Sequence, residues 1–425
     1  MDVPQINRER LLDGMFAPLR NVDYRRLITS NALWWATIFM EGTVLGWLVL
    51  DLTNSPWMVA MIGFCRSAPF PVMGFLNGPL IDRFGRRKII LAAQTTNLLM
   101  YLILSVILWR GQLAIWHLAL TAMVLGICWA LDWPARRALM PDLVGKERTV
   151  DAMLLENMAQ NVARIIGPAL AGTLIAVYGA KGCFSVMALL SCLTLLLLHT
   201  LSQQPIPRTN MRPQLSPWTL IGETLRYARH HQAILGVLLV TAAMNIFIFP
   251  YMTLLPVFAR DVLGQGPVGL GILGTGSGIG AFAGLYLINR LRQRIGPGWI
   301  FIVGTCFMCL TLMAFALSTQ FSLSWSMLLL VGMGQACFGS MQSSIILLSA
   351  SDEMRSRAMG TLVLAISADP LGKLQTGFLA DQWGAQNAVA AQAGMGLVVI
   401  AGIALLLPGL RAPDVSVARS VVVDS

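Results

Sequence analysis

The chain of 425 residues is 56% hydrophobic and 12% charged, and its formal net charge is +10. Soluble domains carry about a quarter of their residues as charged side chains, so this composition excludes a soluble enzyme or binding module. A positive balance can also indicate nucleic-acid binding, but membrane proteins collect Lys and Arg in cytoplasmic loops, and we expect no nucleic-acid partner.

Twelve apolar segments are long enough to cross a bilayer, because about 20 helical residues span its hydrocarbon core. The sequence therefore predicts an all-α membrane protein with twelve transmembrane helices. The predicted spans are 27–51, 57–80, 89–109, 113–134, 153–177, 182–201, 233–257, 266–288, 299–318, 324–349, 358–381 and 387–408.

The distribution of cationic residues predicts the orientation, since Lys and Arg are retained on the cytoplasmic side. With the amino terminus inside, 24 of the 30 Lys and Arg residues fall in cytoplasmic segments, three in external loops and three within spans. Both termini are therefore expected in the cytoplasm. The predicted parts are a cytoplasmic arm (1–26), a six-helix bundle (27–201), a cytoplasmic linker (202–232), a second six-helix bundle (233–408) and a cytoplasmic tail (409–425).

A charged stretch, Asn77 to Lys88, separates the second predicted span from the third. It contains the spacing Gly-x-x-x-Asp-Arg-x-Gly-Arg-Arg, which in this position resembles the loop between helices 2 and 3 of the major facilitator superfamily. The matching residues are Gly78, Asp82, Arg83, Gly85, Arg86 and Arg87. The resemblance implies a secondary transporter of two pseudo-symmetric six-helix bundles, and internal repeats are typical of such transporters.

The same resemblance implies partners for this loop. Asp132 ends the fourth span, where an acid in this family pairs with the loop arginines. Asp82 would lie near the amino terminus of helix 11, where unpaired amides and the helix dipole favour a carboxylate. Together these contacts would latch the cytoplasmic face shut. The alternative is that the loop only sets topology, which explains its arginines but not the acid beside them.

Two charges lie near mid-depth in the first two spans, Glu41 and Arg66. Charges in a bilayer core are costly unless they face protein or water, so each is a candidate functional residue. One interpretation is a structural ion pair that fixes the packing of the two helices. The other is a proton-coupling site, since burial favours a protonated carboxyl and a nearby guanidinium favours the ionised form. The sequence leaves both open.

The fifth span contains a motif that resembles the Gly-Pro-x-x-Gly-Gly core of the helix 5 motif in drug/proton antiporters. The matching residues are Arg164, Gly167, Pro168 and Gly172. Ala171 replaces the first of the paired glycines, and Ala163 replaces an upstream glycine, so small side chains are kept. Small residues and a proline allow a helix to bend and to pack closely, here against helix 8.

The eleventh span carries Asp369 and Lys373. The resemblance to the superfamily implies that the eleventh span lies at the seam between the two halves, and a weak internal repeat aligns Arg164 with Asp369. Structural pairing is the expected role of Asp369, which is also the main alternative to Glu41 as the proton-coupling carboxylate.

Two longer sequence segments, Pro134–Gly172 and Leu255–Gly264, resemble the enterobactin-exporter-like secretion branch of the drug/proton antiporters. The resemblance implies a bacterial inner-membrane exporter of siderophores, macrolides or other small molecules, with protons as the coupling ion. In this superfamily certain spans line the substrate cavity. In this chain those spans would supply aromatic and amide side chains, which suit a bulky aromatic or amphipathic solute. These residues are Trp34, Trp35, Trp129, Asn245, Phe249, Gln335 and Gln342.

Two other functions are weighed against export. An uptake symporter is disfavoured by the helix 5 motif. A polytopic membrane enzyme would need an Asp-rich metal motif or a catalytic His/Asp pair, and the sequence has neither. No Walker motif is present, and Cys306-x-x-Cys309 lacks a second ligand pair, so we expect no cofactor and no metal. A monomer is expected.

Overall fold

The computed structural model describes residues 16–202, 226, 229, 231–292, 294–350 and 355–411. Within these ranges every regular element is a helix, as the sequence predicts. The predicted arm before residue 16, nearly all of the predicted linker and the predicted tail after residue 411 lie outside the described residues. Contacts divide the chain into two compact units, Met1–Val44 with Val72–Asn210, and Leu45–Pro71 with Met211–Ser425.

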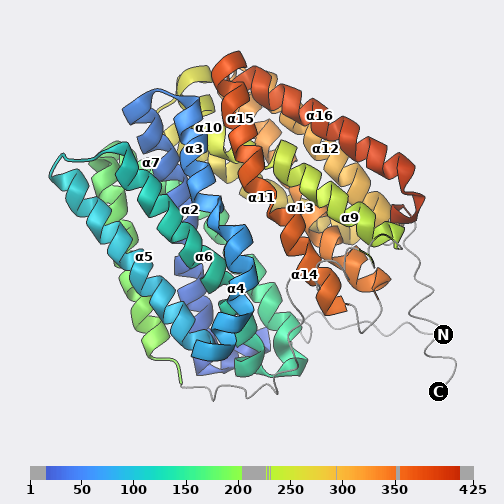
Figure 1. Ribbon diagram of the computed structural model, residues 1–425, viewed down its shortest axis with the longest axis horizontal. Coiled ribbons are helices and arrows are strands. Elements are labelled where there is room, and N and C mark those ends of the chain that lie inside the picture. Colours follow the sequence, from blue (N-terminus) through green and yellow to red (C-terminus); the bar gives the residue numbers. More distant parts are fainter. Residues whose placement is uncertain are drawn as a thin grey trace. The chain divides into compact units, whose positions relative to one another are not determined.

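The first unit is built around long apolar helices. It contains most of α2 (Val22–Thr53), most of α4 (Pro69–Phe84), α5 (Arg86–Trp109), α6 (Ile115–Val144) and α7 (Thr149–His199), with the short η1 (Ala17–Arg20) and η2 (Lys146–Arg148). Helix α5 packs against both α6 and α7 (Figure 1). Within α7, Gly179 has a φ of 69°, which a glycine adopts without a Cβ penalty, and this break separates the predicted fifth and sixth spans.

The second unit contains the remaining helices. These are α3 (Pro56–Ser67), α9 (Gln232–Ala243), α10 (Tyr251–Val257), α11 (Pro267–Leu291), α12 (Pro297–Leu317), α13 (Phe321–Ser349), α14 (Arg355–Ile366), α15 (Asp369–Trp383) and α16 (Ala385–Leu406), with the π-helical turns η3 (Met244–Ile248) and η4 (Phe258–Val262) and the short η5 (Pro408–Leu410). Proline at the first turn of α3, α11 and α12 costs no hydrogen bond, because the first amides of a helix have no intrahelical partner.

Nine helical segments among the described residues are long and apolar enough to cross a membrane. Helix α7 accounts for two predicted spans, because Gly179 divides it. The second and eleventh predicted spans are each broken into two shorter helices, α3 with α4 and α14 with α15. The twelve predicted spans are therefore helical, although the fifth and sixth are joined in α7 and the second and eleventh are each divided.

Both broken spans are interrupted close to a proline. Helix α3 ends at Ser67 just before Pro69, and α14 ends at Ile366 shortly before Pro370. Proline removes a backbone donor and clashes with the preceding turn, so helices end or kink beside it. Helix α3 packs against α15 inside the second unit. Arg66, Asp369 and Lys373 thus lie within a few residues of a helix break.

The second unit is held by very close helix packing. A Cβ added at Gly280 of α11 would overlap the carbonyl oxygen of Leu329 on α13, and one at Gly284 would come within 2.7 Å of the Met333 oxygen. Small residues let helix backbones approach in this way within a bilayer, where hydrophobicity does not drive helices together. The glycine-rich sequence of α11 is therefore explained by its contact with α13.

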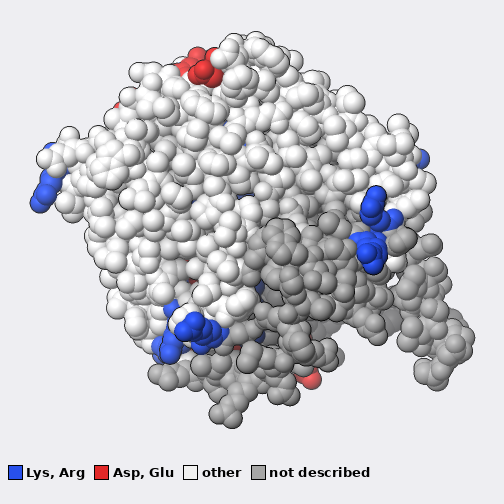
Figure 2. Space-filling model, viewed as in Figure 1, with Lys and Arg blue, Asp and Glu red and all other residues white. Residues whose placement is uncertain are grey.

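The surface of the described residues carries few charges. In the view of Figure 2, uncharged residues cover most of this surface, and the Lys, Arg, Asp and Glu side chains gather in small separate groups. Large apolar side chains are exposed along one side of α5, at Leu99, Leu102, Ile103 and Val106. Their spacing of three and four residues makes one face of a helix, as expected for a face in contact with lipid.

Candidate functional site

A buried ion pair lies at the centre of a polar network in the first unit. Arg136 Nε donates to Asp132 Oδ1 over 2.7 Å, and the two side chains are 1% and 0% exposed. Both residues come from α6, one turn apart. Gln94 of α5 also donates to Asp132, from Nε2 to Oδ2 over 2.5 Å. The carboxylate is therefore satisfied on both oxygens, as a buried charge requires.

The network continues to a second carboxylate on α7. Arg136 Nη1 donates to Asn31 Oδ1 over 2.6 Å, and Asn31 Nδ2 donates to Glu156 Oε2 over 2.7 Å. Trp35 Nε1 donates to the other oxygen of Glu156 over 2.8 Å. One guanidinium and two carboxyl groups are thus joined across α2, α6 and α7. A buried network in which each charged group has a partner makes the arrangement of these helices rigid.

Asp132 does not have the partner that the sequence predicted. The prediction pairs it with the arginines of the loop between the second and third spans, but its carboxylate bonds Arg136 and Gln94 inside the unit. The physical reason is the length of α6, which continues through Pro134 to Val144 and brings Arg136 one turn from Asp132. The i, i+4 spacing of these two residues is the signal that the prediction missed.

The loop arginines bond other groups. Arg86 pairs with Asp142 near the end of α6, and Arg87 Nη2 donates to the carbonyl oxygen of His199 over 2.8 Å. The guanidinium of Arg83 lies 5.2 Å from the centre of the Phe84 ring. Gly85 has a φ of 83° and makes the turn from α4 into α5, which explains this glycine of the motif. Gly78 lies within α4, and a Cβ there would meet nothing within 4 Å.

Asp82 belongs to the last turn of α4, but its side chain lies outside the described atoms. Its predicted contact with helix 11 involves a residue range of the other unit, so the latch remains a prediction.

Glu41 is buried in the first unit and is 2% exposed. The hydroxyl of Tyr101, on α5, donates to Glu41 Oε2 over 2.9 Å. Tyr101 was not among the predicted site residues, because an isolated tyrosine in an apolar span carries no motif. Arg66 belongs to α3 in the second unit, so the predicted contact between Glu41 and Arg66 remains a prediction.

The helix 5 motif has a clear packing role within the first unit. A Cβ at Gly167 would lie 2.7 Å from Phe39 Cβ and 3.0 Å from the Ala36 oxygen, both on α2. Pro168 and Gly172 are buried inside α7, which remains helical through the motif. The Arg164 guanidinium lies 5.6 Å from the centre of the Phe39 ring. Gly167 thus permits close packing against α2, and the predicted contact with helix 8 is not tested.

The predicted cavity residues fall into two groups. Trp34, Trp35 and Trp129 join one aromatic cluster with Trp133 and Phe39 in the first unit. In the second unit, Gln342 Nε2 donates to the Thr241 hydroxyl over 2.6 Å, and Asn245 Nδ2 donates to the backbone carbonyl oxygen of Thr241 over 2.9 Å.

Two further cavity predictions fall on α13 and beside η3. Phe249 packs edge-on against Phe338, with 5.5 Å between ring centres. Gln335 lies on α13, one turn before Phe338, and is partly exposed. The predicted aromatic and amide residues thus cluster within each unit separately.

The predicted seam charges form an ion pair in the second unit. Lys373 Nζ lies 2.7 Å from Asp369 Oδ2, one turn apart on α15, and the two side chains are 18% and 21% exposed. Gly63 of α3 lies beside this pair, since a Cβ there would come within 3.5 Å of Lys373 Cδ. Within the described ranges, no group of three or more His, Cys, Asp or Glu side chains could hold a metal ion.

Comparison with known proteins identifies related transporters. The family model described as transmembrane secretion effector matches residues 13–421. The enterobactin exporter EntS of Salmonella choleraesuis is 24% identical over 405 residues, covering 95% of this chain and 96% of that protein. The staphyloferrin A transporter of Staphylococcus aureus is 25% identical over 253 residues, covering 59% of this chain and 63% of that protein.

A macrolide efflux protein and a solved structure extend the comparison. Macrolide efflux protein A of Streptococcus pyogenes is 23% identical over 370 residues, covering 85% of this chain and 88% of that protein. A crystal structure of a bacterial homologue of the human lysosomal transporter Spinster, inward-facing and unoccupied, has a TM-score of 0.74 at 15% identity. It covers 92% of this chain and 98% of that chain. The structural likeness confirms the predicted transporter fold.

Proposed function

Since the chain belongs to the transmembrane secretion effector family of membrane transporters, we propose that it is a proton-coupled exporter of a medium-sized organic molecule. The single observation that carries export is the match to an enterobactin exporter over 95% of the chain. The similarity to a macrolide efflux protein supports the same direction. Family and relatives are transporters, so the chain is not an enzyme.

Coupling to protons is assigned to Glu41. A proton-driven exporter needs a group that takes up a proton on one side and releases it on the other. The Glu41 carboxyl is buried in a membrane span and accepts a hydrogen bond from the Tyr101 hydroxyl, and a carboxyl in this position is a candidate functional group. Movement of the two halves around a central site would then expose Glu41 to each side in turn, as in other transporters built from repeats.

The substrate is proposed to be a bulky aromatic or amphipathic solute such as a siderophore or a drug. Support comes from the indole cluster of Trp34, Trp35 and Trp129 and from the amides of Asn245 and Gln342 on the proposed cavity helices. Aromatic side chains provide a large apolar surface together with a polar edge, which suits solutes of mixed character.

The orientation is proposed from charge asymmetry, with both termini in the cytoplasm of a bacterium. Single-cysteine labelling in a cysteine-free background tests it. A cysteine in place of Arg86 should react only from the inside, and one in place of Lys181 only from the outside. Opposite accessibility at either position would overturn the assignment, because an error in span number reverses every later loop.

Proteoliposomes with an imposed pH gradient test the coupling assignment. The purified wild-type protein should move its substrate against the direction of proton flow, once a compound-sensitivity panel in an efflux-deficient bacterial host has identified that substrate. Glu41→Gln should fold and bind substrate but lose gradient-driven transport. Tyr101→Phe should keep transport, because it removes the donor and leaves the carboxyl.

The matched control is Asp369→Asn, which alters the other membrane carboxylate considered for coupling. If Glu41→Gln still follows the pH gradient and Asp369→Asn does not, the coupling site lies in the second unit and the assignment is wrong. If no host strain becomes resistant to any compound and no substrate leaves the vesicles, export itself is refuted.

A further inference from the structure

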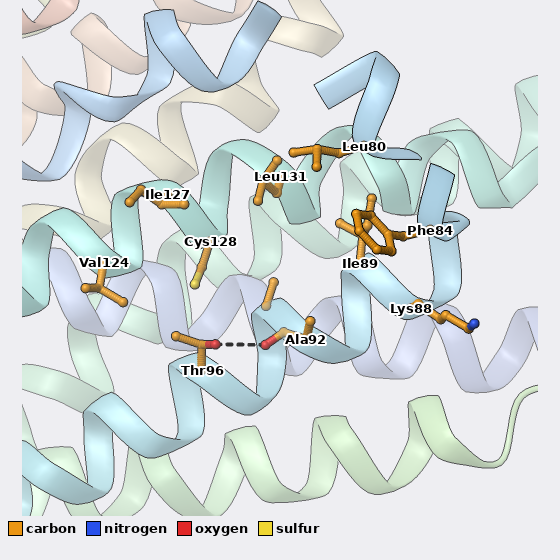
Figure 3. A pocket seen from close by; sticks show the side chains of 11 residues that line it. Leu80, Phe84, Lys88, Ile89, Ala92, Thr96, Val124, Ile127, Cys128 and Leu131 are labelled. Atoms are coloured by element: carbon orange, nitrogen blue, oxygen red, sulfur yellow. Dashed lines mark hydrogen bonds between the residues drawn. The ribbon is translucent and has the colours of Figure 1, made fainter. Parts of the chain in front are cut away.

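A groove of about 470 Å³ lies between α4, α5 and α6 of the first unit (Figure 3). Leu80 and Phe84 of α4 line it together with Val124, Ile127, Cys128 and Leu131 of α6. Helix α5 supplies the rest, Lys88, Ile89, Ala92, Ala93 and Thr96. None of these residues belongs to the candidate substrate or coupling site.

The lining of this groove is apolar except at one end. The Thr96 hydroxyl is satisfied, since it donates to the Ala92 oxygen over 3.0 Å. The remaining polar group is the Lys88 amine, which lies at one end of the groove and points away from the apolar walls, whereas Val124 lies at the other end (Figure 3). The groove therefore offers a long apolar surface that ends at a cation.

The groove opens towards a face of the unit with apolar character. Phe84 is 45% exposed, and Ala92 is also exposed. One to three turns beyond Thr96, α5 presents Leu99, Ile103 and Val106 to the outside. A helix face of this composition in a membrane protein contacts acyl chains, so the occupant of the groove is expected to come from the bilayer.

The cations near the groove differ in their partners. Arg86 is paired with Asp142, and Arg87 is bonded to the carbonyl of His199. Lys88 is exposed and forms no ion pair with the part of the chain that the structure describes. The Arg83 guanidinium lies over Phe84, which itself lines the groove. The Lys88 amine thus remains beside the groove to bind an anion.

We propose that the groove binds an anionic glycerophospholipid, with an acyl chain along the walls of α4, α5 and α6 and the phosphate group at Lys88. Basic pockets between transmembrane helices at the cytoplasmic side are suited to anionic lipid head groups. The lysine stem can extend along the lipid while its amine reaches the head-group level. The proposal is independent of export and of proton coupling.

Native mass spectrometry of the delipidated, full-length protein tests the proposal. Wild type is titrated with phosphatidylglycerol or with phosphatidylethanolamine of the same acyl chains. The first phosphatidylglycerol should bind about fivefold more tightly, which is the effect of one cationic residue near an anionic lipid. Lys88→Ala should lower phosphatidylglycerol binding to the level of phosphatidylethanolamine, and Ala92→Trp, which fills the groove, should weaken both lipids.

Two control variants make these outcomes specific. Arg110→Ala removes an exposed cation at the other end of α5, and Leu99→Trp adds the same bulk to the exposed face of α5 outside the groove. Equal binding of the two lipids by wild type would overturn the proposal. So would an effect of Arg110→Ala as large as that of Lys88→Ala, or of Leu99→Trp as large as that of Ala92→Trp. If Ala92→Trp elutes as aggregate, Ala92→Leu provides a smaller filling of the groove.

Discussion

Two ion pairs of the same local geometry differ in their surroundings. Asp132 with Arg136 and Asp369 with Lys373 both join residues four apart on one helix, and both have a nitrogen–oxygen distance of 2.7 Å. The first pair is fully buried, whereas about a fifth of each side chain of the second pair is exposed. Sequence spacing is the same in both, so the difference comes from the rest of each unit.

The difference extends to the whole of the described interior. The charged side chains that are buried, Glu41, Asp132, Arg136 and Glu156, all belong to the first unit. Buried polar residues of the second unit are uncharged, such as Thr241, Gln342 and Gln392. The second unit is instead held by glycine contacts between α11 and α13. The stability of the first unit therefore depends on hydrogen bonds and ion pairs to its buried charges. The stability of the second unit depends on close packing between its helices.

The largest expected effect follows from breaking the buried pair. Asp132→Asn leaves the Arg136 charge without its partner inside the protein, and loss of one member of a buried pair costs about 3–5 kcal/mol. Unfolding of the purified protein in mixed micelles measures this loss. The double variant Asp132→Asn/Arg136→Gln removes both charges and should recover part of the stability. A single variant as stable as wild type would mean that the network does not hold the first unit.

The steric fit of the second unit can be tested with two glycines. Gly280→Ala places a methyl group against the Leu329 carbonyl, and overpacking of this kind costs about 1–3 kcal/mol. Gly394→Ala is the matched control in α16, since a Cβ there meets nothing within 4 Å. That variant should be neutral or more stable, because alanine favours a helix more than glycine does. Equal stability of the two variants would contradict the role of close packing.

Much of the fold could be predicted from the sequence. The bilayer determines how long each apolar segment must be and on which side the Lys and Arg residues are retained. The prediction missed the breaks in the second and eleventh spans, although Pro69 and Pro370 are local signals for them. It also ended the fourth span at residue 134, a proline, whereas α6 continues to Val144. A proline inside a helix usually ends or kinks it. Packing within the unit outweighs that local preference.

The candidate site was predictable only where residues carry a motif or an unusual charge. Glu41 and Asp132 were found because a carboxylate in an apolar span is costly. Gln94 bonds Asp132, Tyr101 bonds Glu41 and Asn31 bonds Glu156, and each pair joins two different helices with no shared spacing in the sequence. Their roles depend on which helix faces pack together, and that information is not local in the sequence.

The smallest expected effect belongs to the more exposed pair. Asp369→Asn removes one charge from a pair whose two side chains are partly exposed. Partly exposed pairs of this spacing contribute less than about 1 kcal/mol to the free energy of unfolding. Its unfolding in mixed micelles should therefore differ little from that of wild type. A loss as large as that of Asp132→Asn would show that the second unit also depends on a buried charge. If Asp369→Asn keeps its stability but loses gradient-driven transport while Glu41→Gln retains it, the coupling site lies in the second unit, because a purely structural pair would change folding before it changed coupling.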